Sequence, residues 1–183
     1  MLEVNLNSYN NSWYRPGSKL KQIVWYYINL LFLKNSLNPF SSLKVILLKM
    51  FGAEIGKNVV IKQNVNVKYP WLLKIDDYSW IGENVWIDNL ASVEIGKNCC
   101  LSQGALLLCG NHNYIKTSFD LIVKPILIKD GVWIGARAVV TSGVTCNEHS
   151  VLSVNSVATQ NLESYTIYQG NPAKAIRRRI IKE

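Results

Sequence analysis

Histidine and cysteine are both scarce in this chain of 183 residues. It has two histidines, His112 and His149, and four cysteines, none of which forms a CxxC pair. No spacing of cysteine and histidine completes a zinc site, and no secretory signal peptide precedes the cysteines. The composition therefore predicts reduced thiols, a cytoplasmic location and no bound metal.

Long apolar runs and acidic residues are scarce as well. The longest apolar run, IVWYYINLLFL at 23–33, contains an asparagine and is shorter than the about 20 residues that a membrane-spanning helix needs. Twelve Asp and Glu stand against 20 Lys and Arg, which gives a formal net charge of +8. Such an excess suits an anionic ligand or surface but identifies no partner by itself. With 49% hydrophobic residues, the chain has the composition of one globular domain.

The middle of the sequence contains a repeat of six residues. An aliphatic residue opens nearly every unit, a small or β-branched residue usually follows four places later, and Asn, Gly or Asp lies between them. A period of six fits neither a helix nor plain strand alternation, but it fits a short strand followed by a corner, where Asn and Gly tolerate a left-handed backbone. The opening residues, which we expect to point inward, are Ile55, Ile61, Val67, Ile75, Ile81, Ile87, Ile95, Leu101, Leu107, Ile128, Ile134, Val140, Cys146 and Leu152.

Three such units make one triangular coil, so residues 55–163 predict an all-β solenoid of about five coils. The repeat stops after LLCGNH, and residues 113–127 leave it before Ile128 resumes the pattern. An excursion of this length from a solenoid is usually functional or a mobile flap.

Residues 1–54 lack the repeat and predict a helical segment. Two helices are expected at 18–34 and 38–52, with Asn38 as the cap and Pro39 as the first residue of the second helix. Such a segment is expected to cap the open end of the solenoid, which a stack of this kind needs.

Two features at the ends of the chain leave alternatives open. The aromatic-rich segment 18–52 is an alternative candidate for peripheral contact with a membrane. The segment 164–183 is basic, and it predicts a tail with a short C-terminal helix on which Lys174 and Arg177 share a face. The alternative is that this run of basic residues is simply a solvated tail with no ligand.

The repeat resembles that of the left-handed β-helix acyltransferases, whose hexapeptide units build the solenoid. Within that superfamily, three segments look most like the colanic-acid-biosynthesis acetyltransferases: SLKVILLKMFGAEIG at 42–56, GNHNY…FDL…KPI at 110–126, and GNPAKAI at 170–176. The resemblance implies left-handed coils and a homotrimer with sites between neighbouring solenoids. It also implies transfer of an acetyl group from acetyl-CoA to a sugar hydroxyl of an exopolysaccharide, a lipopolysaccharide or a precursor, in the cytoplasm or at the inner face of the membrane.

His112 is the candidate general base, because the resemblance implies one essential histidine at the start of such a loop. A sugar hydroxyl is a poor nucleophile, and a base must accept its proton as it attacks the thioester. Histidine, with an unperturbed pKa of about 6.5, suits this task, and such a base contributes roughly 10²–10⁴ in rate. Asp88 and Asp120 are the candidates for orienting its ring, although Asp88 could instead contact the acceptor. Cys109 is expected to be a packed small side chain and not a nucleophile.

The remaining candidate residues bind the two substrates. Basic residues that meet the phosphates of coenzyme A are implied by the resemblance at the C-terminus, where Lys174 and Arg177 are the candidates. Trp133 and the backbone at Gly135, Ala136, Ser153 and Val154 are expected to line the same groove. The candidates for binding the acceptor are Trp86, Asn89, Asn111, Asn113 and Tyr114.

Other functions remain as alternatives. A β-helix can serve as a non-catalytic scaffold or binding protein, and an acyltransferase of this fold can act on an amino sugar or an antibiotic. A metal enzyme like the γ-type carbonic anhydrases needs three histidine ligands per site. This chain has only His112 and His149, and His149 falls at a turn position where we expect an ordinary exposed side chain, so such a site cannot be built. Nucleic-acid binding is not favoured, because the basic cluster is short and no recognition motif surrounds it.

Overall fold

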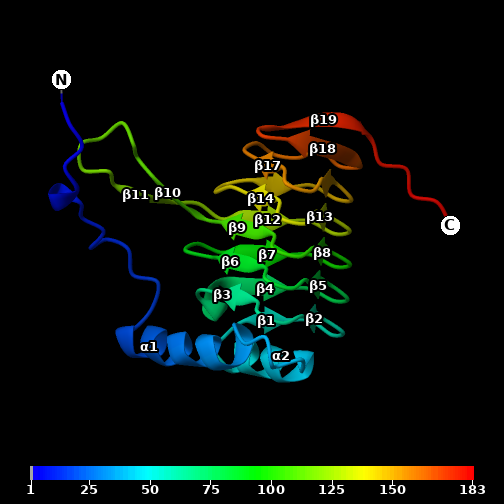
Figure 1. Ribbon diagram of the computed structural model, residues 1–183, viewed down its shortest axis with the longest axis horizontal. Helices are drawn as coiled ribbons and strands as arrows, with labels where there is room; N and C mark the ends of the chain where they lie inside the picture. Colours follow the sequence, from blue (N-terminus) through cyan, green and yellow to red (C-terminus); the bar gives the residue numbers. More distant parts are fainter. Residues whose placement is uncertain (1) are drawn as a thin grey trace.

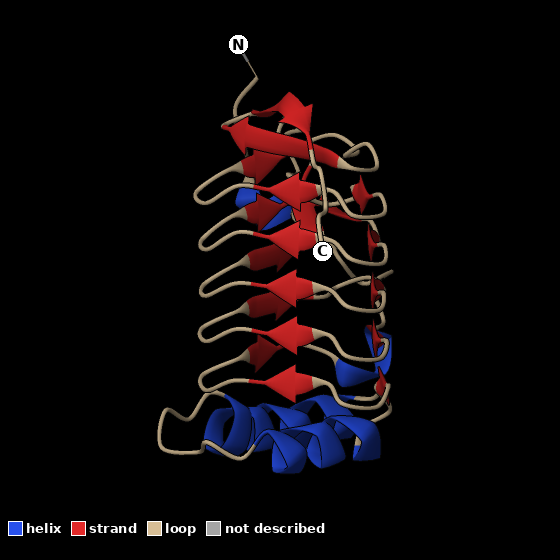
Figure 2. Cartoon of the chain, turned by 90° about the vertical axis from the view of Figure 1, so that its right-hand side faces the viewer, coloured by secondary structure: helices blue, strands red, loops and turns tan. Residues whose placement is uncertain are grey.

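The computed structural model describes residues 2–183 as a triangular solenoid that stands on two helices (Figure 1). Its strands form three sheets, one for each face of the triangle, and Figure 2 shows the coils stacked above the helices. The first face contains β1 (Glu54–Ile55), β4 (Leu73–Ile75), β7 (Val93–Ile95), β12 (Ile126–Ile128) and β15 (Thr145–Cys146). The second contains β2 (Val60–Ile61), β5 (Trp80–Ile81), β8 (Cys100–Leu101), β13 (Trp133–Ile134), β16 (Val151–Leu152), β18 (Thr166–Gly170) and β19 (Ala173–Arg178). The third contains β3 (Asn66–Val67), β6 (Trp86–Asp88), β9 (Leu106–Leu108), β14 (Val139–Val140) and β17 (Val157–Ala158).

The core of the solenoid is a stack of aliphatic side chains. Ile61 pairs with Ile81 in the next coil, and Ile81 pairs with Leu101 in the one after. All the residues that open the units of the repeat are buried, Cys146 included. The prediction that they point inward is therefore confirmed, and each coil repeats the same packing on the coil below.

The corners use the left-handed backbone that the repeat predicted. The fourth residue of most units lies there with a positive φ, whether or not it is an asparagine or a glycine; the units that open at Val67, Ile87 and Leu107 are the exceptions. Tyr78, Arg137 and His149 take this conformation at the same place in their units. The asparagines and glycines at this place are Asn58, Asn64, Asn84, Asn98, Asn155, Gly104, Gly131 and Gly143.

The solenoid has about six turns, one more than the sequence predicted. Leu162 forms an isolated bridge with Cys146, and β18 pairs in parallel with β16, so the segment after residue 158 starts a further turn. The repeat does not reveal this turn because its residues no longer follow the six-residue pattern.

Two helical segments cover the base of the solenoid, as predicted, but their bounds differ from the prediction. The first is α1 (Lys19–Ile28), which continues as a π-helix, η2 (Asn29–Leu33). The second, α2 (Ser41–Met50), begins after Phe40 and not at Pro39, because the Asn38 side chain accepts a hydrogen bond from the Phe40 backbone N–H and closes a turn before the helix.

Buried polar bonds fasten these helices to the first coil. The indole of Trp25 donates to the carbonyl oxygen of Val67 at 2.8 Å. The ammonium of Lys44 is buried and donates to the carbonyl oxygens of Asn38 and Lys62, at 2.8 and 2.9 Å. The segment therefore caps the stack.

The prediction of a short C-terminal helix is wrong. Residues 173–178 form β19, which pairs antiparallel with β18 across a bulge. Lys174 lies opposite Gln169, and Arg177 lies opposite Ile167. Non-local pairing with the last coil outweighs the local helical pattern, so Lys174 and Arg177 do not share a helical face.

The interruption of the repeat is a β-hairpin that projects from the third coil, and we call residues 109–125 the arm (Figure 1). Its strands β10 (Gly110–His112) and β11 (Leu121–Val123) pair antiparallel. The first-face sheet continues past it, because β12 pairs with β7. The sequence predicted an excursion at 113–127, and the structure starts it earlier, at Cys109, and returns the chain to the coil at Ile126.

Candidate functional site

His112 lies on β10 of the arm, outside the coils, and not at the coil corner where the repeat register placed it. Its Nδ1 lies 2.9 Å from the carbonyl oxygen of Phe119. A carbonyl only accepts hydrogen bonds, so Nδ1 carries the hydrogen and Nε2 is left as the acceptor nitrogen. Nε2 can therefore take a proton from a substrate.

Aromatic rings fix the plane of this imidazole. Phe119 stacks on it with ring centroids 4.4 Å apart and planes 8° apart. Tyr9, from the N-terminal segment, lies 5.8 Å away on a tilted plane. Phe119 also has a φ of +50°, which is uncommon for a bulky residue and is typical of functional sites. Its ring and its carbonyl oxygen therefore position the same histidine.

Neither carboxylate that the sequence proposed orients His112. Asp120 lies on the arm but forms an ion pair with Lys116 at 3.0 Å, and hydrogen bonds from Ser118 and Lys116 lower its pKa. Asp88, at the end of β6, is 7% exposed, and its Oδ1 lies 3.2 Å from Nζ of Lys68. The partner of the ring is a backbone carbonyl, which carries no signature in the sequence.

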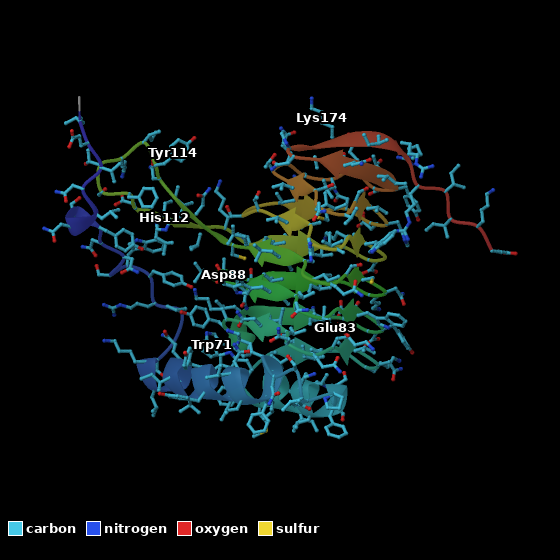
Figure 3. All side chains as sticks on the ribbon, in the orientation of Figure 1. Trp71, Glu83, Asp88, His112, Tyr114 and Lys174 are labelled. Atoms are coloured by element: carbon cyan, nitrogen blue, oxygen red, sulfur yellow. The ribbon has the colours of Figure 1, made fainter. Side chains whose placement is uncertain are left out.

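A cleft of about 750 Å³ opens beside His112. The N-terminal segment forms one of its walls, the arm forms another, and the third face of the solenoid forms its floor. Figure 3 shows His112 on the arm, with Asp88 on the solenoid side of the same region. The lining residues are Tyr9, Asn11, Tyr14, Arg15, Pro16, Gly17, Ser18, Lys19, Gln22, Lys68, Tyr69, Leu90, His112 and Leu121.

The cleft is basic and rich in tyrosine. Its lining includes Arg15, Lys19 and Lys68 and contains no carboxylate. The Tyr14 hydroxyl donates to the Leu90 carbonyl oxygen at 2.6 Å, and burial raises the pKa of this phenol. The Tyr14 hydroxyl therefore stays protonated and keeps its role as a hydrogen-bond donor. The arrangement suits a polar ligand that carries negative charge.

The N-terminal segment, residues 2–18, holds the arm in place, and sequence reasoning missed this role. The Asn5 backbone N–H donates to the Thr117 carbonyl oxygen at 2.8 Å, near the tip of the arm. Trp71, in the 3-10 helix η3 (Pro70–Leu72) between the first and second coils, donates to the carbonyl oxygen of Pro16 and anchors the other end of the segment. The segment has no periodic pattern, so only its tyrosines and tryptophan could have drawn attention to it.

The residues proposed to bind the acceptor do not gather at one place. Asn89 is fully buried, and its amide bonds both the N–H and the carbonyl oxygen of Tyr69, so it is a structural residue and not a ligand of the acceptor. Trp86 is 45% exposed and lines a separate groove against α1. Asn111, Asn113 and Tyr114 lie on the arm with His112, although none of the three lines the cleft. Figure 3 shows Tyr114 at the outer part of the arm.

A second groove, of about 600 Å³, gathers six of the seven residues proposed for the cofactor. It contains Trp133, Gly135, Ala136, Ser153, Val154 and Arg177, together with Arg179, which sequence reasoning did not select. Lys174 is not among the lining residues.

Three features give this groove its shape. The Trp133 indole donates to the hydroxyl of Ser102 at 2.9 Å, which fixes the ring along the groove. A Cβ on Gly135 would lie 2.6 Å from the backbone nitrogen of Val154 in the next coil, so a glycine is needed there for the coils to stack. Arg179 donates to the carbonyl oxygens of Gly131 and His149, at 2.8 and 3.2 Å, and this holds the chain after β19 against the groove.

The groove and His112 lie on different sides of one chain. The groove belongs to the second face, which carries β8, β13 and β16, and the arm leaves between the third face and the first (Figure 1). A single chain therefore does not bring the groove residues to its own His112.

His149 and Cys109 have structural surroundings. His149 is partly buried and packs on Tyr165 with ring centroids 4.7 Å apart, so the expectation of an ordinary exposed histidine is corrected. Cys109 is buried at the root of the arm, and burial raises the pKa of its thiol to about 11. Among residues 2–183, no group of three or more His, Cys, Asp or Glu side chains is placed to hold a metal ion. No helix in the same range is long and apolar enough to cross a membrane.

Comparison with known proteins gives consistent results. The chain is 32% identical to colanic acid biosynthesis acetyltransferase WcaF of Escherichia coli K12 over 170 residues, which cover 93% of each chain. A hexapeptide-repeat acetyltransferase of Vibrio cholerae in complex with acetyl coenzyme A matches with a TM-score of 0.79 and 22% identity over 87% of each chain. A maltose O-acetyltransferase of Clostridium difficile matches with a TM-score of 0.75 and 22% identity over 90% of each chain. No model of a known protein family matches the sequence.

A solenoid of hexapeptide coils, interrupted by an arm that carries a histidine, together with the 32% identity to an acetyltransferase over 93% of the chain, defines an acyltransferase of the hexapeptide-repeat class. The chain belongs to the hexapeptide-repeat acetyltransferases, in the family of colanic acid biosynthesis acetyltransferase WcaF. Its solenoid is the left-handed β-helix that the resemblance to this family implied, and the protein is an enzyme and not a passive scaffold.

Proposed function

We propose that this enzyme moves an acetyl group from acetyl-CoA to a hydroxyl of a sugar in an exopolysaccharide, a lipopolysaccharide or a precursor of one. The observation that carries the proposal is the pairing of His112 Nδ1 with the Phe119 carbonyl oxygen, beside a basic cleft large enough for a saccharide. The names of the relatives, an acetyltransferase of colanic acid biosynthesis and a maltose O-acetyltransferase, support the same class of acceptor.

The proposed reaction is a direct transfer. The acceptor hydroxyl attacks the carbonyl carbon of the thioester while Nε2 of His112 accepts its proton. The tetrahedral intermediate then collapses, the carbon–sulfur bond breaks, and the imidazolium returns the proton to the departing thiolate. The buried Cys109 thiol takes no part, because no acyl-enzyme is needed.

We propose that the working form is a homotrimer in which each site lies between two chains. His112 and the groove around Trp133 and Arg177 lie on different sides of one chain, and a neighbouring solenoid would supply the missing groove. In this arrangement Trp133 and the backbone at Gly135, Ala136, Ser153 and Val154 hold coenzyme A. Arg177 and Arg179 meet its phosphates, because guanidinium groups suit phosphate geometry.

We further propose that the acceptor carries negative charge, such as a uronic acid or a phosphate-linked saccharide. Arg15, Lys19 and Lys68 line the cleft, and no carboxylate is among its lining residues. Lys68 is paired with Asp88, so Arg15 and Lys19 are the cations that an anionic acceptor would meet first. A neutral amino sugar or antibiotic would gain nothing from this charge.

Acetyl-CoA turnover with charged and neutral saccharides tests the proposal. His112→Ala is expected to lower kcat by roughly 10²–10⁴ while the melting temperature stays unchanged, because the arm lies outside the core. The matched control is His149→Ala, which removes the other histidine and should leave kcat within about threefold. An His112→Ala enzyme with the wild-type kcat would contradict the mechanism, and a fully active monomer would contradict the shared site.

A further inference from the structure

The two helical segments at the base expose apolar side chains on the side that faces away from the solenoid. One side of α1 and η2 packs on the first coil through Trp25, Asn29 and Leu33, which are buried. The opposite side should be polar in a soluble helix of this kind. It is apolar instead, with exposed residues at helical spacing: Leu20, Ile23, Val24, Tyr27, Leu30 and Leu31.

The second helix repeats the arrangement. Lys44 and Leu48 of α2 are buried against the solenoid, while Leu43, Ile46 and Met50 are exposed on the other side. Met50 is 73% exposed, and Phe40, just before the helix, is 65% exposed. Figures 1 and 2 show both helices forming the base of the molecule, with the coils on one side of them only. We call the exposed apolar residues of 20–50 the basal face.

The charge carried by the helical segments themselves has one sign. Residues 4–53 contain no aspartate or glutamate, although the chain has 12 of them elsewhere. The same stretch contains six basic residues, of which Lys19, Lys34 and Lys49 are exposed on the helical segments. No ion pair within residues 2–183 involves any of these three lysines. The face therefore combines exposed apolar and aromatic side chains with a net positive charge, although Lys49 also lies near Glu54 and Asp76 of the adjoining coils.

We propose that the basal face docks on the surface of an anionic lipid bilayer. A helix that lies in the membrane interface has this composition, with apolar and aromatic residues on one face, lysines around them and low overall hydrophobicity. Neither helical segment is long enough to span the bilayer, so the contact is peripheral. Anionic lipids attract lysines at the surface, and the apolar residues then enter the boundary between headgroups and acyl chains.

A second copy of the chain fits this face less well than a lipid surface does. Two basal faces brought together would place their lysines against each other with no carboxylate between them, and like charges at an interface are repulsive. An anionic bilayer supplies the opposite charge over the whole face.

The docked orientation also places the acceptor cleft beside the membrane. Ser18, Lys19 and Gln22, at the start of α1, line the cleft that His112 borders. An acceptor held in the same bilayer by a lipid would reach this cleft without leaving the surface. This consequence rests on the proposed function, whereas the docking itself does not.

Sedimentation with vesicles tests the docking in the absence of acetyl-CoA. The full chain is mixed with phosphatidylcholine vesicles that contain about one third phosphatidylglycerol, and with vesicles of phosphatidylcholine alone. We expect the wild type to sediment with the anionic vesicles, to stay largely in solution with the neutral ones, and to dissociate as salt is raised.

Two variants examine the charge and the apolar side chains separately. Lys34→Glu with Lys49→Glu should weaken binding to anionic vesicles by more than about tenfold. The matched control, Lys57→Glu with Lys97→Glu, makes the same change of charge at exposed corners of the coils and should bind nearly as the wild type does. Ile23→Gln with Ile46→Gln should also weaken binding while light scattering shows no change of assembly.

Several results would overturn the proposal. In the first, the wild type stays in solution with anionic vesicles. In the second, the basal-face variants bind to these vesicles as strongly as the wild type does. In the third, light scattering shows that the wild type forms assemblies that separate in the Ile23→Gln, Ile46→Gln variant. The last result would show that a second copy covers the face. Coenzyme A binding, measured by thermal shift on the same variants, should be unchanged, so loss of docking is distinguished from loss of the proposed reaction.

Discussion

The solenoid and the arm are built on opposite principles, although they adjoin each other at Cys109. In the solenoid every coil repeats the same inward residues and the same left-handed corner, so each position is supported by the coils above and below. In the arm and the N-terminal segment no pattern repeats, and the His112 ring is held by the ring and carbonyl oxygen of Phe119 and by the ring of Tyr9. Each position of the solenoid is thus supported by many equivalent contacts, whereas the candidate site depends on a few. Substitutions in the two regions should therefore have different consequences.

The largest difference should appear in stability. Leu107 is fully buried in the third coil, and Leu107→Ala should lower the free energy of unfolding by about 2–5 kcal/mol. Ile115, at the tip of the arm, is 84% exposed, and Ile115→Ala should change the free energy of unfolding by less than about 0.5 kcal/mol. Urea unfolding of both variants measures the contrast. Equal losses would mean that the arm contributes to the core.

The next effect concerns the support of His112. Phe119→Ala removes the stacked ring but keeps the backbone carbonyl, so the imidazole loses its fixed plane. We expect kcat to fall by about 10- to 100-fold with little change in the unfolding midpoint, because misplacement of a catalytic group lowers the rate. Phe119→Leu, which keeps bulk without an aromatic face, should recover part of the loss. A wild-type kcat for Phe119→Ala would show that the hydrogen bond alone orients the ring.

A smaller effect should separate the basic residues of the C-terminal strand. Arg177→Ala should raise the KM for acetyl-CoA by about tenfold, since Arg177 lines the groove and bonds to charged groups contribute about 1.5–3 kcal/mol. Lys174→Ala serves as the matched control, and its KM should change by less than about twofold because Lys174 lies outside the groove. Steady-state kinetics measures both KM values. A larger rise in KM for Lys174→Ala than for Arg177→Ala would place the phosphate-binding site at the other end of β19.

The smallest effect concerns the cysteines. Burial raises the pKa of Cys109 and Cys99 to about 11, so at pH 8 only about one thiol in a thousand is ionised, and this fraction rises about tenfold for each unit of pH. In the native protein we expect a thiol reagent to modify the partly exposed Cys100 first. Cys109→Ala should retain kcat within about twofold. Rapid modification of Cys109 with loss of activity would contradict its structural role.

The sequence predicted most of the frame and less of the site. The inward residues and the corners follow from a local period, so Ile81 or Asn84 can be placed from its neighbours alone. His112 was selected by its place at the interruption of the repeat, although the register put it at a coil corner and not on the arm. The Phe119 carbonyl that pairs with its ring is a backbone atom, and backbone atoms leave no mark in the residue pattern.

Long-range pairing explains the remaining differences. Residues 173–178 have a local pattern that suits a helix, yet one edge of β18 is paired with β16 and the other edge is open, and residues 173–178 pair with that open edge. The contact of Asn5 with Thr117 joins residues that lie far apart in the chain, and neither residue belongs to a motif. Such contacts depend on the folded frame, so they cannot be derived before the frame is known.

The root of the arm has a consequence for how this family can diversify. The arm leaves and rejoins the solenoid across one hydrogen bond, from the Lys124 backbone N–H to the Cys109 carbonyl oxygen at 3.1 Å, while the sheet from β7 to β12 continues beside it. Its ends are thus already closed, and an insertion at its tip adds little loop-closure entropy. On the proposed function, in which the arm borders the acceptor cleft, a change in the length or sequence of the arm could therefore alter acceptor preference without any change in the stack.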